Sequence, residues 1–112
     1  MRIPEIVHIG GLPYIVTRVP PSTLGEQREG FISYREQGIP LVDADTDYAK
    51  ITFLHECLHG MLEALGLTEA NQDERLVDGL AHQLYQLLED NPQLLAQGGE
   101  DPEPDDTEGE AS

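Results

Sequence analysis

The sequence predicts an α+β fold in which a small, mostly antiparallel sheet packs on two helices. Two observations predict it. Residues 1–45 contain short, partly alternating runs of β-branched residues, and beyond residue 45 leucines recur at helical spacing. The length fits one domain over residues 1–97, because a chain of 112 residues with 38% hydrophobic side chains can build one modest core but not two.

Four short strands, arranged as two hairpins, are expected in the first part of the chain. The first hairpin, residues 3–19, turns at Gly10-Gly11-Leu12-Pro13. The second, residues 30–43, turns at Glu36-Gln37-Gly38. Pro40 has no N–H to donate to a ladder, so its strand should begin late or lie at a sheet edge.

Two helices are expected after residue 45. The first should begin at an N-cap within Asp45-Thr46-Asp47 and end at Gly66, since glycine readily takes the left-handed cap conformation. Its apolar stripe comprises Ile51, Leu54, Leu58, Met61, Leu62 and Leu65. The second helix should run from about Asn71 to Asp90, where Asn91-Pro92 ends it. Its stripe comprises Leu76, Val77, Leu80, Leu84, Leu87 and Leu88.

The last segment, residues 98–112, differs in composition from the rest of the chain. It carries seven acidic residues, no basic residue and a single apolar residue, Ala111. Such a segment cannot bury enough surface to offset its ordering entropy, so we expect an acidic disordered tail.

The charge of the chain excludes several kinds of partner. It has 22 acidic and 6 basic residues, for a net charge of −16. Phosphate backbones and anionic lipids repel such a chain, so we expect neither nucleic acid nor membrane partners. No apolar run approaches the roughly 20 residues that span a bilayer, and the first residues lack the apolar stretch of a signal peptide. With the lone Cys57, these features predict a cytoplasmic location.

The first expected helix contains the sequence His55-Glu56-Cys57-Leu58-His59. Histidines at i and i+4 project from one helical face, so both imidazoles can reach one metal ion. Glu56 is rotated about 100° from His55, where it can meet a water molecule on that ion. This pattern predicts a hydrolytic zinc site with Glu56 as general base toward a zinc-activated water. The alternative is a pair of histidines that pack on the helix and bind nothing.

A catalytic zinc needs a third protein ligand, which the second helix can supply from Asp73, Glu74, Asp78 or His82. Leu65 occupies the position where a metzincin would need a histidine. Glu74 and Asp78 are spaced i, i+4 and share a face. We expect Glu74 to bind zinc and Asp78 to accept a hydrogen bond from a zinc histidine. The alternatives are the reverse assignment and a solvated acidic face.

Three further residues are expected to have ordinary roles. Cys57 lies about 200° around the helix from His55, so we expect a small buried residue and not a ligand. His82 and Tyr34 could each donate a hydrogen bond to a reaction oxyanion. A surface histidine and a packed tyrosine are the simpler interpretations.

Two patterns carry a resemblance to the ImmA/IrrE-type metallopeptidases. They are H-E-x-x-H over residues 55–59 and E-x-x-V-D-x-L-A-x-x-L-Y over residues 74–85. The chain looks closest to the small stand-alone members common in phages and prophages, and its Glu-x-x-x-Asp element is also similar to the thermolysin-like gluzincins. The resemblance implies a zincin-like core, with Glu56 as base and the zinc ligands His55, His59 and Glu74. It covers residues 30–92 well and the first strands loosely.

The expected function is therefore zinc-dependent hydrolysis of a peptide bond in a protein or peptide substrate. The alternative is a zinc-stabilised binding or regulatory module, such as a phage accessory protein, with little or no turnover. The two differ at the fourth zinc position. A hydrolase leaves this position open to solvent beside a groove, whereas a structural site closes it with a protein side chain.

Overall fold

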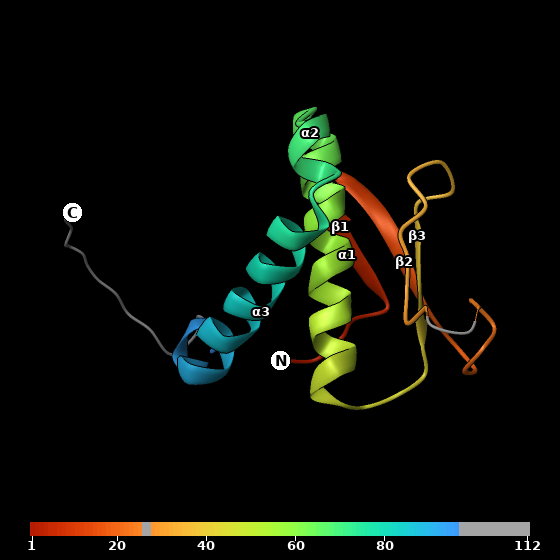
Figure 1. The fold of residues 1–112 in the computed structure, drawn as a ribbon. Helices are drawn as coiled ribbons and strands as arrows, with labels where there is room; N and C mark the ends of the chain where they lie inside the picture. Colours follow the sequence, from red (N-terminus) through yellow and green to blue (C-terminus); the bar gives the residue numbers. More distant parts are fainter. Residues whose placement is uncertain (26–27, 97–112) are drawn as a thin grey trace.

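Three strands and three helices follow one another in residues 1–25 and 28–96, the part of the chain that the computed structural model describes (Figure 1). The strands are β1 (Ile6–Ile9), β2 (Leu12–Val19) and β3 (Gly38–Val42). The helices are α1 (Asp47–Leu65), α2 (Thr68–Asn71) and α3 (Glu74–Asp90), followed by the 3-10 turn η1 (Pro92–Leu95). The tail expected at 98–112 lies outside the described residues. The α+β class is confirmed.

The sheet is mixed, so the expectation of a mostly antiparallel sheet is wrong. Its order is β1-β2-β3. β1 and β2 form the expected antiparallel hairpin, with Gly10 and Gly11 at positive φ in the turn. β3 instead runs parallel to β2, with Val16 opposite Ile39. A parallel pair needs a long connection between its strands. The last part of this connection, residues 28–37, runs antiparallel beside β3 before the chain turns into it.

The segment expected as the third strand, residues 30–35, is not a regular strand. Two isolated antiparallel bridges, at Gly30 and at Ser33, join it to β3. β3 is itself an edge of the three-stranded sheet, as expected for the strand that contains Pro40. Phe31 lies opposite Pro40, and its backbone N–H donates to the Pro40 carbonyl. Pro40 has no N–H with which to donate to Phe31 in turn.

Helix caps define the two long helices. The Thr46 hydroxyl caps the start of α1, and Gly66 ends α1 in the left-handed conformation at φ 74°, so both predicted ends are confirmed. The predicted start of the second helix is wrong. Asn71 ends the short helix α2, and the Asp73 side chain caps α3 by accepting from the N–H of Leu76 at 3.1 Å. Asparagine and aspartate are similarly good caps, and the later one is used.

α1 lies between the sheet and α3 (Figure 1). The face of α3 in the core carries Val77, Ala81 and Tyr85, not most of the predicted leucine stripe. Leu76, Leu80 and Leu87 are 41–50% exposed. The small side chains of Val77 and Ala81, together with a 2.7 Å hydrogen bond from the Tyr85 hydroxyl to Asp47, set the helix in this rotation. Within the described residues, no helix is long and apolar enough to cross a membrane.

Candidate metal centre

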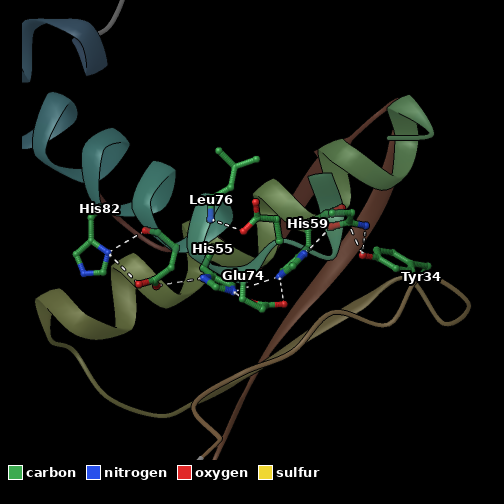
Figure 2. Close-up of polar contacts among 9 residues, drawn as sticks. Tyr34, His55, His59, Glu74, Leu76 and His82 are labelled. Atoms are coloured by element: carbon green, nitrogen blue, oxygen red, sulfur yellow. Dashed lines mark hydrogen bonds and ion pairs between the residues drawn. The ribbon is translucent and has the colours of Figure 1, made fainter. Parts of the chain in front are cut away.

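His55 and His59 lie one turn apart on α1, and their rings meet edge to face with centroids 4.8 Å apart. Their Nε2 atoms are 3.2 Å apart (Figure 2). The i, i+4 spacing accounts for this approach, because residues four apart stack on one helical face. α1 therefore presents two imidazole nitrogens at one point.

Glu74, the first residue of α3, reaches the same point. Its Oε1 lies 3.1 Å from the Nε2 of His55, and its Oε2 lies 3.3 Å from the Nε2 of His59. The Asp73 cap fixes the start of α3 and thereby places Glu74 opposite α1. The three side chains offer ligand atoms within 4.8 Å of one another, an arrangement that could hold a metal ion. The structure thus brings together the three residues that the sequence pattern singled out.

Asp78 contacts the other ring nitrogen of His55, with its Oδ1 3.4 Å from Nδ1. A carboxylate can only accept, so this contact favours a proton on Nδ1 and leaves Nε2 free to bind a metal. His82 turns instead toward its own helix, with Nδ1 2.9 Å from the Asp78 carbonyl oxygen. It does not join the cluster.

Asn71 and Tyr34 hold His59 in a way that sequence reasoning missed. The Nδ1 of His59 lies 2.6 Å from the Asn71 side-chain oxygen, which can only accept a hydrogen bond. The Asn71 amide donates to the Tyr34 hydroxyl at 3.1 Å, and that hydroxyl donates to the His59 carbonyl oxygen at 3.4 Å. This closed ring of hydrogen bonds leaves the Nε2 of His59 facing Glu74. The spacing of α1 gave no signal for this contact, because Asn71 lies at the end of α2, 12 residues after His59.

Glu56 borders the centre without joining the group of ligand atoms. Its side chain is buried, with 8% of the residue exposed, although it lines the same cleft as the histidines. Burial raises the pKa of Glu56 above its ordinary value, against the opposing effects of His55 and His59. A buried carboxylate beside a cleft is suited to exchanging a proton with a bound molecule.

Cys57 is buried on the opposite side of α1, as expected, and belongs to the hydrophobic core. Burial raises the pKa of its thiol to about 12. The thiolate is the form that binds metals and attacks electrophiles, and burial disfavours this form, which fits the expected role of Cys57 as a packed core residue.

The cluster opens into a cleft of about 1080 Å³ between the helices and the segment 28–34. In this segment, the N–H groups of Phe31 and Ser33 bond to β3. The backbone groups of Gly30 and Ile32 therefore point away from β3, by the alternation of an extended chain. Both residues line the cleft, and none of the hydrogen bonds among residues 1–25 and 28–96 uses their backbone groups.

Gly60 allows this segment and β1 to lie close to α1. A Cβ atom at this position would stand 3.0 Å from the Ile32 side chain and 3.1 Å from the Ile9 side chain. A larger residue would push both apolar side chains away from α1. The glycine directly after His59 thus keeps the wall of the cleft against the helix that carries the histidines.

Comparisons with known proteins found no relative of this chain. No protein-family model, no curated protein and no solved structure matches this chain. What the cluster does must therefore follow from its own residues and their contacts.

Proposed function

We propose that this chain is a zinc-dependent metallopeptidase with a zincin-like core of the ImmA/IrrE type. One observation carries the proposal. Two imidazoles and a carboxylate converge beside a large cleft, while a second carboxylate, that of Glu56, flanks them without joining. Hydrolytic zinc sites need these parts: three protein ligands, a base and room for water and substrate.

The donor set fits zinc. His55, His59 and Glu74 would hold the ion, in the two-histidine, one-glutamate combination that catalytic zinc sites use. The far nitrogens of both imidazoles face acceptors, Asp78 and Asn71, and such contacts orient metal-binding histidines. Bound zinc would polarise a peptide carbonyl and lower the pKa of a bound water toward about 7.

Glu56 would move the proton in this reaction. It would take a proton from the attacking water and return it to the amine that leaves, so one carboxylate would act first as base and then as acid. Its place supports this role, because it follows His55 directly on α1 and lines the cleft without being part of the ligand cluster.

The cleft wall suggests how a peptide binds. An extended peptide could add as a strand along residues 28–34, pairing with the backbone groups of Gly30 and Ile32, which no other described residue uses. Such pairing would hold the substrate by its main chain, beside the three ligands.

The alternative is a zinc-stabilised module without turnover. The openness of the site favours the hydrolase over this alternative. Within residues 1–25 and 28–96, no fourth histidine, cysteine or acidic side chain joins the ligand group. The Glu74 side chain is 67% exposed, and all three ligands line the cleft. An open fourth position is typical of catalytic sites and not of structural ones.

The Glu56→Gln variant tests the proposal. This change keeps the shape of the side chain but prevents it from accepting a proton. We expect unchanged zinc content and thermal melting, with hydrolysis of a peptide library reduced by a factor of at least about 10². Glu69→Gln, on the exposed surface of α2, is the matched control and should behave as the parent.

Two outcomes would contradict the proposal. Unaltered turnover of the library by the Glu56→Gln variant would remove Glu56 as the base. Loss of zinc together with a lower melting temperature would make Glu56 a ligand in a closed site and favour the module without turnover.

A further inference from the structure

The end of the cleft near α2 contains a carboxylate that the proposed reaction does not use. Glu63 lies one turn beyond His59 on α1, so the i, i+4 spacing puts it on the same face as the two histidines. It lines the cleft and is exposed. The ion pairs found among residues 1–25 and 28–96 all involve other groups. Its charge is therefore available to a bound molecule.

A fixed aromatic ring borders the same end of the cleft. Tyr34 lines the cleft, and its hydroxyl is held by Asn71 and by the His59 carbonyl group (Figure 2). Glu63 follows His59 by one turn of α1, so the bond from the Tyr34 hydroxyl to the His59 carbonyl places Tyr34 beside the turn that carries Glu63. The other lining residues around them, Thr68, Asn71 and Gln72, are polar and uncharged.

The opposite end of the cleft has a different character. Arg28 lies there with its guanidinium carbon 5.5 Å from the centre of the Phe31 ring, and Glu29 beside it offsets its charge. Tyr48 and Ile51 make the rest of that end largely apolar. The α2 end of the cleft thus carries Glu63 without a basic residue among the lining side chains there, whereas Arg28 stands with Glu29 and Asp78 beyond the metal centre.

We propose that Glu63 and Tyr34 form a subsite for a lysine or arginine side chain of the substrate peptide, so that the substrate class is cationic peptides. A carboxylate attracts the cation, and an aromatic face within about 6 Å of a cation adds to the attraction. The net charge of −16 on the whole chain further draws cationic peptides toward the cleft. The inference rests on the proposed function for the reaction, but peptide binding can be measured without turnover.

Calorimetry on the zinc-loaded Glu56→Gln chain tests the subsite. The probes are acetylated alanine hexapeptides that carry one lysine or one glutamate, moved through each position. At about 0.15 M salt, where charges more than about 8 Å apart are largely screened, lysine at one position should bind roughly 5- to 10-fold tighter than glutamate. Adding Glu63→Gln should remove most of this preference, and adding Glu63→Lys should reverse it. Adding Glu69→Gln should leave it unchanged.

The inference fails if lysine peptides bind no tighter than glutamate peptides at every position, including the case in which neither binds. It also fails if the preference survives in the Glu63→Gln chain, because general attraction by the acidic protein would then explain it. Absence of hydrolysis by the parent chain, with a preference that depends on Glu63, would overturn the proposed reaction and uphold the subsite.

Discussion

His55 and His59 are one turn apart on the same helix, yet different regions of the molecule hold them. Glu74 contacts the Nε2 atoms of both rings, so the difference lies at their far nitrogens. α3 holds the Nδ1 of His55 through the Asp78 carboxylate, which is 58% exposed. His59 is held from the other side, by the neutral Asn71 amide at the end of α2 and by Tyr34 from the cleft wall. The first support is charged and solvated, whereas the second is a closed ring of neutral hydrogen bonds.

The difference suggests that the two imidazoles have separate tasks. The support of His55 depends on how α1 packs against α3, since Asp78 belongs to α3. The support of His59 depends on the turn after Gly66 and on residues 28–34, which also form the cleft wall. His59 thus links the metal centre to the proposed peptide-binding edge, and His55 links it to the helix pair.

Substitution of any of the three expected ligands should have the largest effect on zinc binding. We expect His55→Ala and His59→Ala each to abolish stoichiometric zinc binding, because two remaining ligands do not hold zinc well. Glu74→Ala should weaken binding strongly for the same reason. Zinc content after gel filtration measures this, and His82→Ala is the control that should retain the metal. A His55→Ala chain that binds zinc as tightly as the parent would remove the helix pair as the site.

Substitution of Asp78 or Asn71, the residues that hold the far nitrogens of the two histidines, should weaken zinc binding less. Asp78→Ala and Asn71→Ala should each weaken zinc binding about 10- to 100-fold, as expected for partners that orient metal-binding histidines. The Asp78 contribution should fall more steeply with added salt, because it is an exposed charge, and the Asn71 contribution should not. Chelator competition at two salt concentrations measures both. If Asp78→Ala lowers the zinc affinity more than Glu74→Ala does, Asp78 and not Glu74 is the third ligand.

The smallest effect is expected for Tyr34→Phe. The Tyr34 hydroxyl orients Asn71 but does not contact the His59 ring, so its loss should weaken zinc binding only a few-fold. The combined variant with Asn71→Ala should bind zinc as the Asn71→Ala variant does, because Tyr34 acts through Asn71. Additive losses in the same chelator competition would show that Tyr34 acts on the centre by another route.

The sequence predicted the contacts that depend on helical spacing. His55, Glu56 and His59 lie within one turn and a half of α1, and the i, i+4 pair on α3 meets them because α1 and α3 pack together. Both ends of α1 were predictable because a cap is a local property of the Thr46 side chain and of Gly66.

The rest depends on contacts that are distant in sequence. Residues 30–43 read as an antiparallel hairpin, and nothing in their alternation reveals that β3 also pairs in parallel with β2. Asn71 and Asp73 are both plausible helix caps, and the bond from His59 to Asn71 is visible only once the chain has folded. Of the missed residues, Glu63 alone follows from spacing, since it continues the line of the two histidines.

The most direct test of the central claim is X-ray diffraction from the zinc-loaded chain at the zinc absorption edge. We expect one zinc ion per chain, bound by the Nε2 atoms of His55 and His59 at about 2.0–2.1 Å and by the Glu74 carboxylate. A solvent molecule should complete the site on the cleft side, within reach of Glu56. A fourth protein side chain on the metal, or zinc bound elsewhere on the chain, would contradict the account.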